Sequence, residues 1–457
     1  MQIMKKTLII LACCLFAISL VSCGSSNSSK EKEGENSQIS DSDATEVDDA
    51  GETDADEEND GDDTDNENVE TDADENEEDD SDSESAVADV TSIKFNVPEE
   101  SSVVAEDSGH FAFPDVIRLE SGKLMSVFRV GKNHAERSGY IAYSLSDDGI
   151  NWSESDILVN DNTIDDRDPS IAVLSDGRVA MNWFKYRYPA DYSEPWVHHL
   201  FFAVSDKSGL KFGDHIQVDG GVFDYSETAV MSDDGIWLDE NGNEVTVAAS
   251  SSSVIEHDGK IIIPGYFGNA LNWQSMRKTP KTKIVLYESG DGGATWTPNE
   301  VKAEIEENTW LQEPALLKVT EERWIIQART AKGSSPSNKG DLVQTVSEDG
   351  GKTWSPYKSL GFVAHAPELL KLENGVIISS FRWLEWEESK ATSESVSMVY
   401  SLDGGDTWSD LIEILNCGAV ECGYPGMIEL PGNKILVVYY TPGGTGIDSK
   451  IITFEAE

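Results

Sequence analysis

The sequence has 457 residues, and its 86 Asp and Glu outnumber its 34 Lys and Arg, which gives a formal net charge of −52 at pH 7. Residues 24–90 hold 29 of these acids with only Lys30 and Lys32, so they cannot bury a core, whereas residues 91–457 carry all 12 Trp. Because phosphate would be repelled by so negative a chain, the composition excludes nucleic acid as a partner. The length of the Trp-containing part fits one large domain or two small ones.

The N-terminus has the layout of a secretory signal. Lys5 and Lys6 precede an apolar run, residues 7–20, that is too short for a comfortable membrane span. The run ends in Leu20-Val-Ser-Cys23, which resembles a bacterial lipobox, where the cysteine is lipidated and becomes the new N-terminus. We expect residues 1–22 to be a lipoprotein signal peptide, Cys23 to carry lipid, and residues 23–90 to be a disordered acidic linker. The alternative is a plain cleaved signal with an accidental cysteine.

The remaining cysteines predict a disulfide rather than a metal site. Cys13 and Cys14 lie in the expected signal and Cys23 is taken by lipid, which leaves Cys417 and Cys422. In an exported protein two thiols five residues apart favour a small disulfide loop, and they are too few for a structural zinc site. No metal motif or cofactor fingerprint is visible, so we expect neither metal nor cofactor.

One repeat marks hairpin turns along the rest of the chain. The pattern Ser-x-Asp-Gly-Gly-x-Thr-Trp occurs at residues 289–296, 347–354 and 401–408, with degraded copies at 146–152 and 205–212. Each copy follows an apolar run, so the Asp is expected to cap backbone N–H groups while the Gly residues take positive φ and the Trp folds back as a plug. The three full copies resemble the Asp boxes, or BNR repeats, of sialidase-type β-propellers.

A second repeat predicts the number of blades. In each of its six copies a turn comes eight residues after the first position, and a second apolar strand follows the turn. The copies begin at Pro114, Pro169, Ser251, Pro314, Pro367 and Pro425. Such a period is typical of a radial array, in which each copy and its Asp box supply two hairpins. We predict that residues 91–457 form an all-β, six-bladed propeller of four-stranded antiparallel blades. Residues 92–97 or 450–455 would complete a shared blade and close the ring.

The repeat also predicts which side chains converge. Inner strands start at one end of the axis, so the residues before each repeat should meet at the mouth of the channel: Phe113, Asp168, Ser250, Glu313, Ala366 and Tyr424. Seven residues past each turn, the second strands return to this end with Arg129, Phe184, Tyr266, Arg329, Arg382 and Tyr440. Three Arg at equivalent positions favour an anionic ligand such as a carboxylate. The alternative is that each Arg pairs with a neighbouring acid such as Asp115, Asp168 or Glu313.

Two segments resemble the catalytic segments of sialidases. Gln312-Glu313-Pro314, running on to Arg329, resembles the segment whose Glu serves the nucleophile, and Gly423-Tyr424-Pro425 resembles the segment with the nucleophilic Tyr. Arg382 matches a further Arg of the family's carboxylate-binding triad. The resemblance implies that Tyr424 attacks, Glu313 takes its proton, and Arg129, Arg329 and Arg382 hold the sugar's carboxylate. A neutral Tyr suits a sialic acid because an anionic nucleophile would be repelled by the carboxylate on the anomeric carbon.

Two departures from the family pattern concern the substrate. Sialidases open the first inner strand with Arg-Ile-Pro, whereas this chain has Ala112-Phe-Pro114. They also carry a general-acid Asp before the first Asp box, where this chain has residues 134–140 without an Asp. Arg129 would replace the missing Arg, and Asp168 or His134 the missing acid. These departures also leave room for another sugar, a uronic acid or a neutral glycoside.

The sequence therefore supports two hypotheses. The first is an exported, membrane-tethered monomeric exo-glycosidase that acts on terminal, acidic sugars of glycans and touches the membrane only through its lipid. Asp115, His134 and Tyr266 would line its substrate site, and Trp383 would form a platform for a sugar ring. The second is a propeller that binds glycans without cutting them.

Overall fold

The computed structural model describes residues 87–187, 194–222, 228–233, 235–270, 282–332, 339–387 and 390–457. The expected signal peptide, the lipidated Cys23 and nearly all of the expected linker lie outside the described residues. Within the described part the chain is built from strands, with one short 3-10 helix, η1 (Pro442–Gly444). None of the described helices is long and apolar enough to cross a membrane.

Within the described residues the strands form six antiparallel sheets of four or five strands and one sheet of two strands, and the six larger sheets confirm the predicted six-bladed propeller. Blade 1 is β3 (His110–Arg118), β4 (Leu124–Gly131), β5 (Tyr140–Ser146) and β6 (Asp156–Val159), and blade 2 is β7 (Asp165–Val173), β8 (Val179–Arg187), β9 (Val197–Val204) and β10 (Ile216–Gln217). Blade 3 is β13 (Thr246–Ala249), β14 (Ile255–His257), β15 (Lys260–Asn269), β16 (Lys283–Ser289) and β17 (Thr297–Glu300). Blade 4 is β18 (Thr309–Lys318), β19 (Trp324–Lys332), β20 (Val343–Ser347) and β21 (Lys358–Ser359). Blade 5 is β22 (Ala364–Lys371), β23 (Ile377–Glu387), β24 (Lys390–Ser401) and β25 (Ile412–Gly418).

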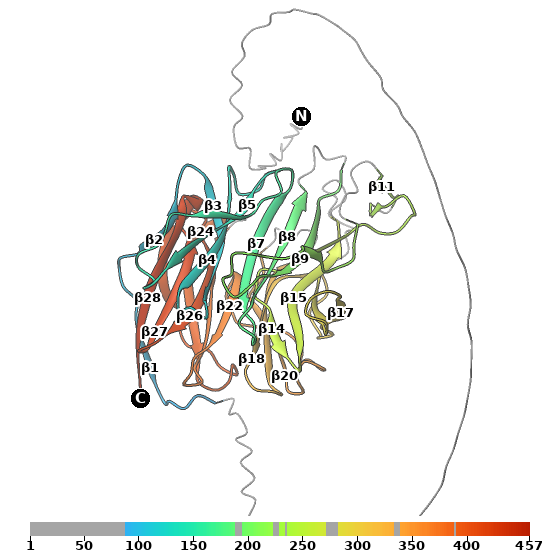
Figure 1. Ribbon diagram of the computed structural model, residues 1–457. Coiled ribbons are helices and arrows are strands. Elements are labelled where there is room, and N and C mark those ends of the chain that lie inside the picture. Colours follow the sequence, from blue (N-terminus) through green and yellow to red (C-terminus); the bar gives the residue numbers. More distant parts are fainter. Residues whose placement is uncertain are drawn as a thin grey trace, which may run out of the picture. The chain divides into compact units, whose positions relative to one another are not determined.

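Blade 6 closes the ring with strands from both ends of the domain. Its core is β26 (Gly423–Leu430), β27 (Lys434–Tyr440) and β28 (Gly446–Ala456), and β1 (Ile93–Asn96) and β2 (Ser102–Glu106) both pair with β28. Figure 1 shows the blue β2 beside the red β28. Both segments that the sequence offered for closure therefore take part, and the pairing ties the first strands of the domain to its last.

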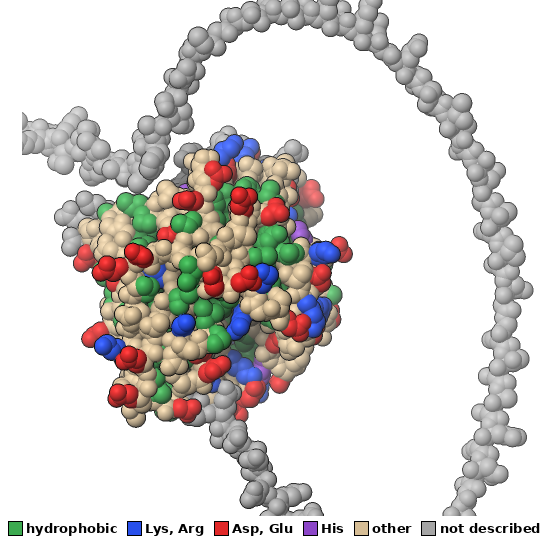
Figure 2. Space-filling view, turned by 60° about the vertical axis from the view of Figure 1, so that its left-hand side comes forward, with side chains coloured by type: hydrophobic (Ala, Val, Ile, Leu, Met, Phe, Trp, Pro, Cys, Tyr) green, Lys and Arg blue, Asp and Glu red, His purple; other side chains and the backbone are tan. Residues whose placement is uncertain are grey.

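Continuous apolar runs form the buried strands. In β27 the residues from Ile435 to Tyr440 are all buried, as expected for a strand covered on both faces by neighbouring blades. Each fully buried Val, Leu or Ile side chain stabilises the fold by about 1.5–3 kcal/mol relative to an exposed one. On the outside of the propeller, acids and bases are interspersed over the visible face (Figure 2).

A repeated β-bulge marks the start of five inner strands. In blades 1, 2, 4, 5 and 6 the register shifts at the proline, where two residues of the inner strand face one residue of the second strand. The residue before each proline has a φ between 46° and 57°; these residues are Phe113, Asp168, Glu313, Ala366 and Tyr424. A non-glycine residue in this conformation costs on the order of 1–3 kcal/mol, and such strain is concentrated at functional sites.

Blade 3 departs from the predicted pattern. The repeat at residues 251–259 was expected to be one continuous inner strand, but β13 ends at Ala249 and β14 begins only at Ile255. Here Ser251 replaces the proline of the other copies, and Ser250 bonds instead to the carbonyl of Pro264 at 2.6 Å. An added two-stranded sheet, β11 (Val230–Met231) and β12 (Trp237–Leu238), precedes this blade and accounts for the longer spacing of its repeat.

The Asp boxes form the expected turns. In the box that begins at Ser289, Asp291 accepts the backbone N–H and the hydroxyl of Thr295 at 2.9 and 2.6 Å. The indole N–H of Trp296 donates to the carbonyl of Gly293, whose φ is 96°. The boxes follow third strands, which run away from the bulges, so they lie at the end of the propeller opposite the bulges.

Candidate active site

The strand register brings the predicted second-strand residues to the bulged end. Each stands opposite the residue two positions before a proline, or opposite its equivalent in blade 3; they are Arg129, Phe184, Tyr266, Arg329, Arg382 and Tyr440. The six positions are therefore equivalent, as the repeat predicts. We call this bulged end of the axis the mouth.

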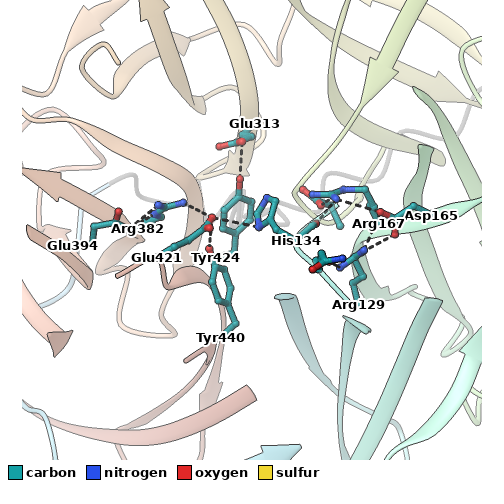
Figure 3. Close-up of polar contacts among 12 residues, drawn as sticks. Arg129, His134, Asp165, Arg167, Glu313, Arg382, Glu394, Glu421, Tyr424 and Tyr440 are labelled. Atoms are coloured by element: carbon teal, nitrogen blue, oxygen red, sulfur yellow. Dashed lines mark hydrogen bonds and ion pairs between the residues drawn. The ribbon is translucent and has the colours of Figure 1, made fainter. Parts of the chain in front are cut away.

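Tyr424 and Glu313 are in direct contact at the mouth. The Tyr424 hydroxyl donates to Oε1 of Glu313 at 2.8 Å, although the two residues are 111 positions apart. Arg329 donates to the same Glu313 oxygen, and Oε2 accepts the backbone N–H of Ala366 at 2.9 Å. Burial and the Glu313 carboxylate raise the pKa of Tyr424 well above its usual 10, so the phenol is neutral at rest. The contact gives Glu313 direct access to the phenolic proton (Figure 3).

Arg382 contacts two carboxylates beside Tyr424. Its Nε and Nη2 lie 2.8 and 2.6 Å from Glu394, and its Nη1 donates to Oε1 of Glu421 at 2.9 Å. The hydroxyl of Tyr440 donates to the same Glu421 oxygen at 3.1 Å. Figure 3 shows this group on one side of the Tyr424 ring. Arg382 is thus present at the mouth as predicted, but Glu421 is a partner that the sequence analysis missed.

A disulfide loop presents Glu421. Cys417, in β25, and Cys422, just before β26, are joined by a disulfide with their Cα atoms 6.4 Å apart. The backbone carbonyl of Glu421 also accepts the N–H of Gly443 at 2.7 Å. Gly423 follows with a φ of 130°, and a Cβ there would lie 2.6 Å from the Cβ of Arg382. Only glycine therefore lets the loop approach Arg382 so closely.

Arg167 takes the place that was predicted for Arg129. Arg129 is fully buried, donates to both oxygens of Asp165 at 2.7 and 2.9 Å, and belongs to the wall of the propeller rather than to the mouth. Arg167 lies between the mouth and that pair, 3.3 Å from Asp165 and 4.8 Å above the ring of Phe113. The signal for it was available, because Arg167 stands two residues before Pro169, as the Arg does in the Arg-Ile-Pro pattern.

Asp168 is a buried carboxyl with one unused oxygen. Its Oδ2 accepts the hydroxyl of Ser251 at 2.9 Å, while its Oδ1 is buried without a hydrogen-bond partner among the described residues and lies 3.9 Å from Nε of Arg167. It lines, with Phe113 and Tyr424, a small cavity of about 20 Å³ on the axis. Burial raises the pKa of Asp168 to about 7, and Glu313 adds to this rise against the opposing effect of Arg167.

Asp115 is placed as a link between blades. Its carboxylate accepts the backbone N–H groups of Val116 and Ile171 at 2.7 and 2.8 Å, and the Ser253 hydroxyl at 2.7 Å. These bonds connect blades 1, 2 and 3. Although Asp115 also lines the axial cavity, its oxygens are already engaged by the protein.

The other predicted contact residues lie near the mouth with different exposure. Nδ1 of His134 lies 3.5 Å from Glu421, and burial together with Arg167 lowers the pKa of His134, so its ring is neutral. Tyr266 is buried, with Glu313 and Asp168 among the charges that act on its hydroxyl. Trp383 is half-buried and packs against the apolar cluster around Phe381.

Lys339 is a further cation that sequence reasoning missed. Its Nζ lies 5.5 Å from the ring centre of Trp386. Burial and the nearby charges of Arg329 and Arg382 lower the pKa of Lys339 to about 7. Lys339 precedes β20 in a loop with no repeat signature, so no pattern in the sequence marks it.

The comparisons with known proteins agree with this architecture. Residues 238–437 match the family model described as "BNR repeat-like domain". No curated protein matches the chain. The domain is similar to a Dyadobacter fermentans protein of unknown function, with a TM-score of 0.62 and 20% identity over 80% of this chain and 100% of the other.

Two enzymes of known type share the fold at lower identity. The Hadza microbial sialidase Hz136 has a TM-score of 0.54 and 17% identity over 75% of this chain and 65% of the other. The α-L-arabinanase of Penicillium chrysogenum has a TM-score of 0.53 and 12% identity over 78% of this chain and 98% of the other. At these identities the likeness shows the propeller fold alone and leaves the reaction to be argued from the residues.

Proposed function

We propose that this BNR repeat-like propeller is a retaining exo-glycosidase that cleaves terminal sugars from glycans with Tyr424 as its nucleophile. The observation that carries the proposal is the contact between the Tyr424 hydroxyl and Glu313 at 2.8 Å. A phenol held against a carboxylate, with a guanidinium on the same oxygen, is the arrangement of a nucleophile activated by an adjacent base.

The reaction follows from the positions of these groups. Tyr424 attacks the anomeric carbon while Glu313 takes its proton, and the bond from that carbon to the leaving oxygen breaks. A general acid protonates the leaving oxygen. Water then attacks the anomeric carbon and gives a proton to the deprotonated general acid, while the bond from that carbon to the phenolic oxygen breaks. The phenol recovers its proton from Glu313, and two inversions at one carbon leave the configuration unchanged.

Asp168 is the better supported general acid of the two predicted. A carboxylic acid with a pKa of about 7 is about half protonated in neutral solution, whereas an ordinary carboxylic acid is almost fully ionised there, and this suits an acid catalyst. His134 has a lowered pKa and carries no proton to donate at the same pH. The geometry around Arg329, whose buried Nε has no partner among the described residues, supports hydrogen bonds to sugar oxygens.

The N-terminal features extend the proposal to the cell envelope. A lipid on Cys23 and a linker of like charges would hold the propeller clear of a membrane after export, as a monomer. Replacing Cys23 by Ser should release the protein from membrane fractions, and continued membrane association would contradict a lipid tether.

A panel of aryl glycosides tests the reaction. We expect the full chain to release aglycone from at least one terminal glycoside, and Tyr424→Phe to lose at least about 100-fold in kcat. Tyr400→Phe, in the outer part of blade 5, is the matched control and should keep its activity. Absence of release from every glycoside, with sugar binding unaffected by Tyr424→Phe, would favour a propeller that binds glycans without cutting them.

A further inference from the structure

Glu421 occupies the part of the mouth where a substrate carboxylate would be expected. Oε1 of Glu421 lies 2.9 Å from Nη1 of Arg382 and 3.1 Å from the hydroxyl of Tyr440. Its side chain is 36% exposed, so solvent and a ligand can reach the carboxylate. In Figure 3 Glu421 lies beside the ring of Tyr424.

The position of Glu421 is built into the fold. The disulfide of Cys417 and Cys422 closes a short loop around it, and the N–H of Gly443 holds its carbonyl. His134 approaches from blade 1 with Nδ1 3.5 Å away. Because covalent and backbone bonds fix the loop on both sides, moving the carboxylate away from Arg382 would require reorganising the segment between β25 and β26.

The three guanidiniums of the mouth already have carboxylate partners. Arg329 contacts Glu313. Arg167 lies within 4.0 Å of both Asp165 and Asp168. Arg382 is paired with two, Glu394 and Glu421, and Lys339 is a further cation whose charge acts on Glu394. A third carboxylate, brought by a substrate, would compete with these two for the same guanidinium and would be repelled by them.

We propose that the site selects terminal sugars that lack a carboxylate at the anomeric carbon, because Glu421 supplies that carboxylate from the protein. The inference rests on the proposed glycosidase function and narrows its substrate to neutral sugars, in place of the acidic sugars that three arginines suggest from the sequence. Glu421 is then a specificity-determining residue, which accepts hydrogen bonds from sugar hydroxyls and opposes anionic sugars.

A tyrosine nucleophile remains suitable for a neutral sugar in this site. An ionised Asp or Glu in the place of Tyr424 would be repelled by the carboxylates of Glu313 and Glu421, whereas a neutral phenol is not. Because Glu421 lies beside the ring of Tyr424, its negative charge would also stabilise a nearby carbon that gains positive charge as the glycosidic bond breaks. Glu421 therefore supplies the negative charge that the substrate's own carboxylate supplies in a sialoside.

Binding of one sugar in a charged and an uncharged form tests the inference. The probes are 2,3-didehydro-N-acetylneuraminic acid and its methyl ester, which differ in the charge of the carboxyl group and in one methyl group. Their binding to the full chain is measured by calorimetry. We expect the wild-type protein to bind the acid no better than the ester. Glu421→Gln should improve the affinity for the acid, relative to the ester, by roughly 10-fold or more, because it removes the carboxylate that engages Nη1 of Arg382.

Matched variants separate this effect from a general change of charge. Glu100→Gln removes one exposed carboxylate away from the mouth and should leave the ratio of the two affinities unchanged. Glu421→Ala removes the carboxylate without adding an amide and should also favour the acid. Thermal unfolding shows that each variant is folded. A wild-type preference for the acid, or failure of both folded Glu421 variants to gain affinity for it, would overturn the inference.

Hydrolysis gives a second and independent readout. The wild-type protein should act on neutral aryl glycosides and not on sialosides, and equal rates on sialosides would contradict the selection. If no glycoside is hydrolysed while Glu421→Gln still gains affinity for the acid, the proposed reaction fails but the charge selection by Glu421 stands. The two proposals therefore fail in distinguishable ways.

Discussion

The two ends of the propeller use carboxylates in opposite ways. In the Asp boxes, Asp291 is exposed and Asp349 is partly exposed, and both accept hydrogen bonds from N–H and hydroxyl groups within four residues along the chain. These bonds lower the pKa of both residues to about 2. At the mouth, Asp168 and Glu313 are buried and contact side chains from other blades, and the pKa of Asp168 rises to about 7.

This difference in burial and pKa distinguishes carboxylates that stabilise turns from carboxylates that can take part in a reaction. An exposed Asp with satisfied oxygens and a lowered pKa stays ionised and holds a hairpin in place. A buried carboxyl with an unused oxygen changes its protonation near neutral pH, which is the property of an acid catalyst. The five strained residues before the prolines all belong to inner strands at the mouth, and none belongs to an Asp box.

Removing one carboxylate charge at each end of the propeller tests this difference most directly. Glu313→Gln keeps the shape of the side chain but loses the base that takes the proton of Tyr424, so we expect kcat to fall by about 100-fold to 10,000-fold. Asp291→Asn removes an equivalent charge from an Asp box and should leave kcat unchanged. Rates are measured on protein whose folding is checked by circular dichroism, because Arg329 also loses its buried partner in Glu313→Gln. Equal activity of the two variants would contradict the distinction.

The pH dependence of activity tests the same difference at Asp168. Because the reaction needs its protonated form, activity should fall as the pH rises through about 7, and Asp168→Asn should be at least about 10-fold slower and lose this alkaline limb. The pKa is raised in the folded state above the unfolded value of about 3.9, so its contribution to stability is fully present below about pH 4 and is lost as the pH rises through about 7.

The stability of the Asn variant gives the matching measurement. Relative to wild type, Asp168→Asn should become more stable by an amount on the order of a few kcal/mol between pH 4 and pH 8, as measured by denaturant unfolding. Asp291→Asn should show the opposite sign, because its pKa is lowered to about 2 and its stabilisation is lost as the pH falls from about 4 toward 2. If the stability difference from wild type changed with pH in the same direction for both variants, the contrast between the two ends would be contradicted.

The sequence predicts those features that depend on residues close together along the chain. The Asp boxes lie within eight residues each, and the repeat before the prolines follows from strand alternation, so both could be read along the chain. Rotational equivalence of the repeats then suffices to bring Glu313 and Tyr424 together. The continuous inner strand predicted for blade 3 was wrong. This copy has Ser251 in place of the proline, the bulge is absent, and the inner strand is divided into β13 and β14.

The partners of the arginines could not be predicted in the same way. Whether Arg129 faces the mouth or the wall depends on Asp165 of the next blade, 36 residues away, and the apolar pattern of the strands does not encode that choice. Glu421 and Lys339 stand in loops outside both repeats, so symmetry gives them no equivalent positions. Their roles follow only from the packing of several blades around one axis.

The smallest expected effect comes from a single Asp box. Asp403→Ala leaves the N–H and hydroxyl of Thr407 and the hydroxyl of Ser401 without their shared acceptor in a turn near solvent, where water replaces part of what is lost. We expect a loss of about 1 kcal/mol in the free energy of unfolding and no change in kcat or KM, since the box lies at the end away from the mouth. Denaturant unfolding and the same glycoside assay measure both. A loss of activity without a loss of stability would mean that this end of the propeller takes part in the reaction, and the division between folding and reacting carboxylates would no longer hold.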